Sequence, residues 1–184
     1  VRDAMRRLVA EGLLAFRPNY GTFVRTWSAD ELRQLFDVRL LLESEMAALA
    51  AARIDAGGVA RLKALQDEME SGGLDLDDTN LARVSALNFE FHGELALACG
   101  NARLVDSLRK SLEAQVTHQT YHRFTKAHLR RTFGHHRELI DAMCVRDPVW
   151  AHHAMGCHVL NAKHVMTDEI AAPGDRRRTR ELDE

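Results

Sequence analysis

Helix signals dominate the sequence from residue 28 onward. Only three prolines occur among 184 residues, and apolar residues in this region recur at spacings of three and four. Ser28 and Glu31 form a capping box, which predicts a helix start. Asp147 and Pro148 show the pattern of a cap followed by proline in the first helical turn. Because no segment here shows strand alternation, we predict an all-α fold, an antiparallel bundle of about six or seven helices.

Breaks between the apolar segments give approximate helix boundaries. Gly57 and Gly58 are expected to end the first helix, so that the second begins near Val59. Gly100 and Asn101 are expected to end the third helix. The expected helices are residues 28–54, 59–69, 79–99, 102–124, 126–145 and 148–170. Residues 171–184 combine a Pro-Gly pair with mixed charge, and we predict a disordered tail there.

The first 27 residues have a different pattern. Residues 1–13 place apolar side chains on one helical face and Arg2, Arg6 and Arg7 off that face. Turn residues separate two short apolar segments within residues 14–25, which predicts a β-hairpin. A basic helix followed directly by a small hairpin is typical of the second half of a winged helix-turn-helix. We therefore expect this helix to enter the major groove of DNA and the hairpin tip to lie beside the backbone.

Charge is unevenly distributed along the chain. The formal net charge is −2, but residues 1–27 hold five arginines against Asp3 and Glu11, a local excess of +3. The remainder is therefore net acidic. This balance excludes a uniformly basic nucleic-acid coat protein and suits a small DNA-contacting unit on an acidic body.

The location of the protein follows from apolar runs and cysteines. No apolar run approaches the ~20 residues that span a bilayer, and no signal peptide is visible. Cys99, Cys144 and Cys157 make an odd count without framework spacing, which favours reduced thiols. We predict a cytoplasmic protein with no membrane partner.

Ten histidines are many for a chain of this length. Asn88 and His92 stand one turn apart on the expected third helix, His136 lies in the fifth and His158 in the sixth. Each adjoins the apolar stripe of its helix. Three imidazoles and an amide oxygen would then converge inside the bundle. Such a set suits a divalent metal, zinc or nickel in the first place and manganese as the alternative.

Two further polar residues leave alternatives open. Arg39 has apolar neighbours on the first helix and is expected to point into the bundle, where a buried arginine needs a partner. That partner is a protein carboxylate, such as Glu43 or Asp37, or the carboxylate of a bound effector. Asn101 either caps the fourth helix or supports a ligand pocket.

Two parts of the sequence resemble known proteins. Residues 1–25 resemble the GntR family of bacterial transcription regulators, and the matched positions are Val1, Arg2, Asp3, Ala4, Met5, Arg6, Arg7, Leu8, Glu11, Gly12, Leu13, Arg17, Pro18, Asn19, Gly21, Thr22, Phe23 and Val24. The body resembles the ligand-binding FCD domain of the FadR branch of that family. There the matched positions are Arg39, Leu42, Glu43, Ala47, Asn88, Phe91, His92, Gly100, Asn101, His136, Leu139, Ile140, Ala142, Ala151, Met155 and His158.

The resemblance implies a partial winged helix-turn-helix over residues 1–27 and an effector-binding helical bundle over residues 28–170. The family places two more helices before this point, so we expect the sequence to be a piece of a longer regulator. Metal-binding members hold a divalent cation at the positions of Asn88, His92, His136 and His158, and a small organic acid binds over it. The family has aspartate at position 88. Because asparagine adds no charge, we expect weaker metal affinity or a stronger demand for an anionic effector.

The resemblance also implies the function. We expect a ligand-responsive transcription regulator that binds a palindromic operator as a homodimer, with repression relieved by a small carboxylic acid. Arg39 and Asn101 are the expected effector-binding residues. The expected DNA-binding residues are Arg2, Arg6, Arg7, Arg17, Asn19, Gly21 and Thr22. The alternative is a metal-dependent enzyme, but the sequence lacks the His-Glu-x-x-His and Glu-x-x-His motifs and a glycine-rich phosphate loop, so we expect no enzyme.

Overall fold

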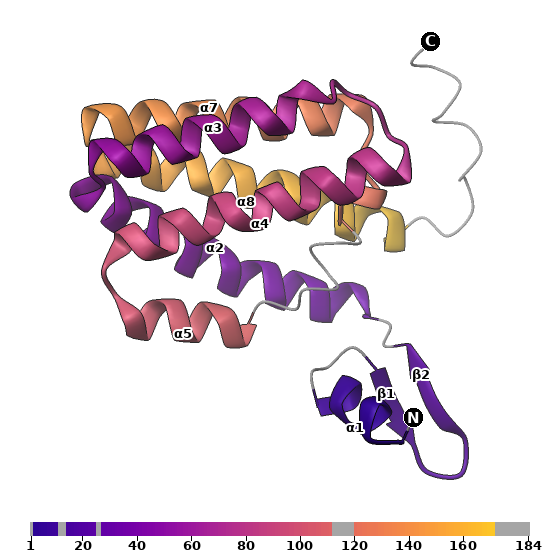
Figure 1. The fold of residues 1–184 in the computed structure, drawn as a ribbon. Helices are drawn as coiled ribbons and strands as arrows, with labels where there is room; N and C mark the ends of the chain where they lie inside the picture. Colours follow the sequence, from indigo (N-terminus) through magenta and orange to yellow (C-terminus); the bar gives the residue numbers. More distant parts are fainter. Residues whose placement is uncertain (1, 11–13, 25–26, 112–119, 172–184) are drawn as a thin grey trace.

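The structure, a computed structural model, describes residues 2–10, 14–24, 27–111 and 120–171. Its helices are α1 (Arg2–Ala10), α2 (Ala29–Arg53), α3 (Ala56–Ser71), α4 (Asp78–Cys99), α5 (Ala102–Ser111), α7 (Lys126–Val145) and α8 (Pro148–Ala171). The strands are β1 (Leu14–Arg17) and β2 (Gly21–Val24). Figure 1 shows α2 to α8 gathered in a bundle, with α1 and the two strands beside the N-terminal end of α2.

Helix α2 is the central helix of the bundle. It packs along α8 and also contacts α4, α5 and α7, while α3 packs on α4 and α7. One apolar core joins these helices, and its largest fully buried side chains include Phe36, Phe91, Leu62, Leu139 and Met155. This arrangement confirms the predicted all-helical bundle. Within the described residues, no helix combines the length and the apolar character that crossing a membrane requires.

The predicted helix starts at Ser28 and Asp147 are confirmed. The Ser28 hydroxyl accepts from the backbone N–H of Glu31, and the Glu31 carboxylate accepts from the N–H of Ser28 at 2.8 Å. The Asp147 carboxylate accepts from the backbone N–H groups of the second and third residues of α8. In both places a side chain satisfies backbone donors that the helix leaves free.

The predicted break at Gly57 and Gly58 is wrong. Helix α2 ends at Arg53, and α3 begins at Ala56, so both glycines lie in the first turn of α3. The physical reason is Asp55, whose carboxylate accepts from the N–H of Gly58 at 2.7 Å, so that the helix starts at Ala56, three residues earlier than expected.

The turn between α4 and α5 matches the sequence. Gly100 ends α4 in the left-handed region at φ 65°, which favours a residue without a Cβ. The expected helix 102–124 is described only in part: α5 ends at Ser111, residues 112–119 lie outside the described residues, and residues 120–122 are helical. The disordered tail predicted for residues 171–184 falls, apart from Ala171 at the end of α8, outside the described residues.

The N-terminal unit, which we define as α1, β1 and β2, contains the predicted hairpin. The strands pair antiparallel from Leu14 with Val24 to Arg17 with Gly21, and α1 packs on β1. The tip is closed by a hydrogen bond of 3.1 Å from the N–H of Tyr20 to the carbonyl of Arg17. Asn19 at φ 67° and Gly21 at φ 102° supply the left-handed backbone that this tight turn needs.

Candidate metal centre

Three histidines from three helices meet in the middle of the bundle. His92 comes from α4, His136 from α7 and His158 from α8, and each offers a nitrogen within 4.8 Å of the others. The ring centroids of His136 and His158 are 4.7 Å apart, and those of His92 and His158 are 5.1 Å apart. We call these three residues the histidine cluster. The sequence predicted this convergence, which requires contacts between residues up to 66 positions apart.

The histidine cluster presents buried nitrogen atoms without partners. Among the described residues, Nε2 of His92, Nε2 of His136 and Nδ1 of His158 are buried and have no hydrogen-bond partner. Leaving a buried polar atom unpaired costs about 1–3 kcal/mol each. A ligand that accepts three nitrogen lone pairs would remove this cost. Imidazole nitrogens are ligands that zinc and nickel prefer, so the residues present fit a divalent cation of this class.

Asn88 lies one turn before His92 on α4. Its side chain is 5% exposed, and its Oδ1 is buried with no hydrogen-bond partner among the described residues. An amide oxygen can ligate a divalent cation without adding charge. Asn88 as a metal ligand therefore stays a prediction that the burial of its oxygen supports.

The His92 ring is oriented from α2. Its Nδ1 lies 3.3 Å from Oε2 of Glu43, and Oε1 of Glu43 accepts from Nε of Arg39 at 2.6 Å. Burial raises the pKa of Glu43, but the charge of Arg39 and the hydrogen bond with His92 outweigh it and hold that pKa well below its ordinary value. An ionised carboxylate on one ring nitrogen directs the other toward the cluster, as in many metal-binding histidines.

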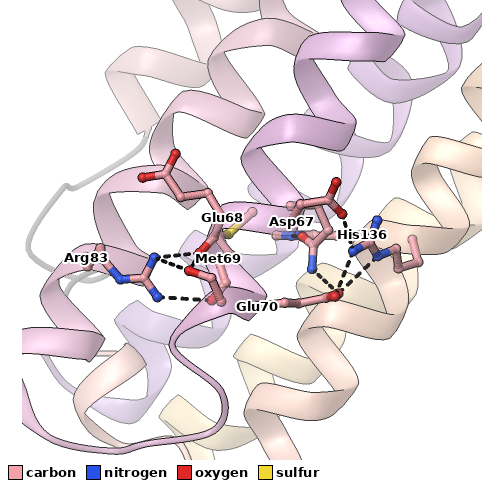
Figure 2. Close-up of polar contacts among 9 residues, drawn as sticks. Asp67, Glu68, Met69, Glu70, Arg83 and His136 are labelled. Atoms are coloured by element: carbon pink, nitrogen blue, oxygen red, sulfur yellow. Dashed lines mark hydrogen bonds and ion pairs between the residues drawn. The ribbon is translucent and has the colours of Figure 1, made fainter.

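The His136 ring is oriented from α3 and α4. Its Nδ1 lies 2.8 Å from Oε1 of Gln66, and its ring stacks on that of Phe91 with centroids 4.3 Å apart. Both Gln66 and His136 are fully buried. Figure 2 shows this part of the structure, with Glu70 and Asp67 of α3 beside His136. The second nitrogen of the ring is thereby left for the cluster.

Two members of the histidine cluster, His136 and His158, are held in the neutral form. Burial lowers the pKa of His136 and of His158 well below the ordinary 6.5, and the neighbouring imidazoles lower both further. Neutral rings keep a lone pair available at pH 7. This is the state that metal coordination needs.

The two predicted effector-binding residues lie in different settings. Arg39 points into the bundle as expected, is 6% exposed, and has Glu43 as its partner, one of the two protein carboxylates considered. Asn101 is exposed, and its Oδ1 accepts from the backbone N–H of Leu104 at 3.1 Å. It therefore caps α5, the simpler of the two roles considered. Effector contacts of Arg39 and Asn101 stay predictions.

The sequence analysis missed Gln66 and the second role of Glu43. Glu43 was considered only as a partner of Arg39, whereas it also contacts His92. Gln66 falls on the buried stripe of α3 between Leu62 and Met69, both fully buried. A polar residue at an apolar position of a helical stripe is the signal that could have found it.

The predicted DNA-binding residues of the N-terminal unit are mostly at the surface. Arg6, Arg17, Asn19 and Gly21 are exposed, and Thr22 is partly buried. Arg6 lies 3.8 Å from Asp3, which is also exposed. The side chains of Arg2 and Arg7 lie outside the described part of the structure. Exposed arginines on a helix and at a hairpin tip can reach phosphates, which is what a nucleic-acid interface requires.

Comparisons with known proteins show which proteins this chain is similar to. The chain is 29% identical over 113 residues to the Nta operon transcriptional regulator of Aminobacter aminovorans, covering 61% of the chain and 52% of the relative. It is 27% identical over 158 residues to the Exu regulon transcriptional regulator of Escherichia coli strain K12, covering 83% of the chain and 54% of the relative. The chain thus spans about half the length of these two relatives.

A solved structure and a family model extend the match. GntR of Streptococcus agalactiae superimposes with a TM-score of 0.59 at 27% identity, covering 89% of this chain and 79% of that one. The two relatives named above are described as transcriptional regulators. The model of the FCD domain matches residues 34–161. Because this match covers well over half of the sequence, the chain belongs to the FCD domain family of GntR-type proteins.

Proposed function

We propose that this chain is the effector-sensing part of a DNA-binding transcription regulator, with a small organic acid bound at a divalent metal in the bundle. Zinc or nickel is the proposed metal, with manganese as the alternative. The observation that carries the proposal is the histidine cluster, in which three nitrogens from three helices lie within 4.8 Å of one another. Each of the three rings also has one buried nitrogen without a hydrogen-bond partner among the described residues. Metal binding satisfies them together.

The charges around the cluster favour an anionic effector. His136 and His158 are neutral, Asn88 is uncharged, and the charge of Glu43 is balanced by Arg39. A bound divalent cation supplies a Lewis-acidic positive charge that these residues leave largely uncompensated. A carboxylate provides both the missing charge and oxygen ligands. The chain's own contribution is to orient the rings and to exclude water from the other faces.

Helix α2 connects the proposed effector site to the N-terminal unit. Trp27 packs against the bundle core, and α2 begins two residues later at Ala29. The same helix carries Arg39 and Glu43, and Glu43 contacts His92. A shift of His92 on effector binding therefore moves Glu43 and α2, and through α2 it reaches the N-terminal unit. Coupling of this kind typically changes affinity at the second site by about 1–3 kcal/mol.

The remaining parts of the proposal concern DNA. Arg2, Arg6 and Arg7 of α1 would face phosphates and base edges in the major groove, and Arg17 with the wing tip, residues 19–22, would approach the backbone or the minor groove. A homodimer would place two such units on a palindromic operator, and the effector would relieve repression in the cytoplasm. The regulators similar to this chain, and the exposure of Arg6 and Arg17, support this role.

The test is metal binding by the purified chain. Zinc and nickel titrations followed by calorimetry, with metal content by emission spectrometry, should show one tight site. His136→Ala should abolish it while circular dichroism stays helical. His153→Ala, which removes an exposed imidazole of α8, is the matched control and should bind like the wild type. Unchanged metal content in His136→Ala would overturn the proposed site.

Asn88→Asp extends the same titration. A carboxylate at position 88 adds a negative charge beside the cation, so metal affinity should rise by about tenfold or more, the equivalent of about 1.4 kcal/mol. Unchanged affinity would mean that residue 88 does not ligate the metal. The assignment of the three histidines would stand in that case, because His136→Ala tests it separately.

A further inference from the structure

We infer that Gln66 is a positioning residue that sets which nitrogen of the His136 ring carries the proton. We further infer that the ion pair between Glu70 and Arg137 at the surface fixes which way the Gln66 amide faces. The consequence for metal affinity rests on the function proposed above. The proposed proton position is that of the metal-free protein.

A continuous chain of hydrogen bonds joins the surface to the cluster. Arg137 of α7 donates to both carboxylate oxygens of Glu70, from Nε to Oε1 at 3.0 Å and from Nη2 to Oε2 at 2.7 Å. Nε2 of Gln66 donates to Oε1 of Glu70 at 2.8 Å. Oε1 of Gln66 then lies 2.8 Å from Nδ1 of His136. Figure 2 shows the bonds that converge on the Glu70 carboxylate beside His136.

The direction of each bond follows from the chemistry of its end groups. Hydrogen bonds from Arg137 lower the pKa of Glu70, so its carboxylate is ionised at pH 7 and can only accept. The amide NH₂ of Gln66 must therefore face Glu70, and its carbonyl oxygen must face His136. Because a carbonyl oxygen can only accept, Nδ1 of His136 must carry the proton. Nε2, the buried atom without a partner, then keeps its lone pair for the cluster.

The ion pair between Glu70 and Arg137 contributes more to the orientation of the Gln66 amide than to the folding free energy. The Arg137 side chain is 39% exposed and that of Glu70 37%, and pairs with this exposure contribute little to folding free energy. Nη2 of Arg137 also donates to Oδ1 of Asp67 at 2.7 Å, which holds the guanidinium in place against Glu70. Gln66 and His136, by contrast, are fully buried and cannot exchange partners with water. The Gln66 amide could face His136 with either its oxygen or its NH₂, and the charges of Glu70 and Arg137 thus decide between these two orientations.

The experiment reverses the polarity of the ion pair. In Glu70→Lys/Arg137→Glu the ammonium of residue 70 can only donate, so the Gln66 amide should turn its oxygen outward and its NH₂ toward His136. The His136 proton should then move from Nδ1 to Nε2. Nitrogen-15 NMR of the metal-free chain, with His136 assigned by comparison with His136→Ala, reads this exchange directly. Zinc affinity should fall by about 10–100-fold in the swapped variant.

A matched control and a rescue separate orientation from structural damage. Arg61 of α3 pairs with Glu94 of α4 at 2.5 Å, and Arg61→Glu/Glu94→Arg is the same kind of swap on the same helix. It should leave the His136 proton on Nδ1. Adding Gln66→Glu to the Glu70→Lys/Arg137→Glu variant restores an acceptor at His136 and should return the proton to Nδ1. A merely structural effect of the swap would not be reversed in this way.

The results test the position of the His136 proton and the proposed metal site separately. A proton that stays on Nδ1 in Glu70→Lys/Arg137→Glu overturns the inference. If that variant does not fold, Gln66→Met removes the acceptor at similar volume, and an unchanged Nδ1 proton there overturns the inference equally. If the proton moves as expected but the wild-type chain binds no zinc, nickel or manganese, the inference stands and the proposed metal site fails.

Discussion

The buried centre of the bundle and the N-terminal unit place positive charge in opposite settings. In the centre, Arg39 is 6% exposed and paired with Glu43 at 2.6 Å. In the N-terminal unit, Arg6 and Arg17 are exposed, and the Asp3 carboxylate that pairs with Arg6 at 3.8 Å is exposed as well. Burying a charge costs several kcal/mol unless it is paired, whereas exposing one costs little.

This difference indicates what each region is built to contact. In the centre, the buried charges of Arg39 and Glu43 pair with each other. Among the described residues, histidine nitrogens there have no hydrogen-bond partner, so a cation is what the centre lacks. In the N-terminal unit, Arg6 and Arg17 are exposed to solvent, so an anionic partner is what this surface can accept. Substitutions should therefore affect folding in the centre and affect binding, with little change in folding, in the N-terminal unit.

Arg39→Met should have the largest effect on stability. It leaves the Glu43 carboxylate buried with His92 as its remaining partner, and breaking a buried ion pair on one side costs about 3–5 kcal/mol. The free energy of unfolding from urea titration measures this loss. Arg33→Met removes an exposed arginine of the same helix, whose partner Asp30 is also exposed, and should cost less than about 1 kcal/mol.

A second variant sharpens this expectation. Arg39→Met/Glu43→Leu removes both charges and should recover most of the loss, because apolar replacements of buried ion pairs are often neutral for stability. Its metal affinity should still be low, because His92 loses the carboxylate that orients it. A loss below about 1 kcal/mol in Arg39→Met would contradict the argument that the charges of the centre are balanced internally.

Acidification should also act on the centre. The pKa values of His136 and His158 are well below 6.5 in the folded chain, so below pH 6.5 the unfolded chain binds more protons than the folded one. Stability is therefore complete above about pH 6.5 and falls as the pH drops, by up to about 1.4 kcal/mol per pH unit for each such histidine. His128 and His135, whose pKa values burial also lowers, add to this slope.

The measurement is urea unfolding between pH 7 and pH 5 with a chelator present, so that metal does not contribute. His158→Gln should reduce the slope of stability against pH, whereas His153→Gln, an exposed position on the same helix, should not. Residues 1–27 contain no histidine, so the N-terminal unit should contribute nothing to this slope. A flat profile would mean that His136 and His158 titrate normally in the folded chain.

The sequence predicts those features that depend on local spacing. The capping box at Ser28, the start of α8 at Asp147 and the hairpin turn around Asn19 follow from residues within one turn of one another. The histidine cluster was predicted because its members adjoin the apolar stripes of three helices and match a known pattern. The start of α3 was predicted at the wrong residue because two local signals compete there. Asp55 favours a helix start as an N-cap, whereas Gly57 and Gly58 favour a break, and the cap prevails.

What the sequence does not predict are contacts between helices. The bond of Gln66 to His136 joins residues 70 positions apart, and no spacing rule brings α3 against α7 in that register. The contact of Glu43 with His92 depends in the same way on how α2 packs on α4. Periodicity states which face of a helix is buried, but side-chain packing decides which residues meet across it.

Arg17→Ala should have the smallest effect on stability and a clear effect on binding. The guanidinium lies 5.9 Å from the centre of the exposed Phe23 ring, a contact worth less than about 1 kcal/mol, so unfolding should barely change. If Arg17 contacts a phosphate, the affinity for a DNA duplex should fall, and the slope of log affinity against log salt should drop by about 1. Fluorescence anisotropy over a salt series measures both, with Arg130→Ala on the exposed surface of α7 as the control. An unchanged slope in Arg17→Ala would mean that the hairpin of β1 and β2 does not contact DNA phosphates. The contrast between the two regions would then depend on the arginines of α1 alone.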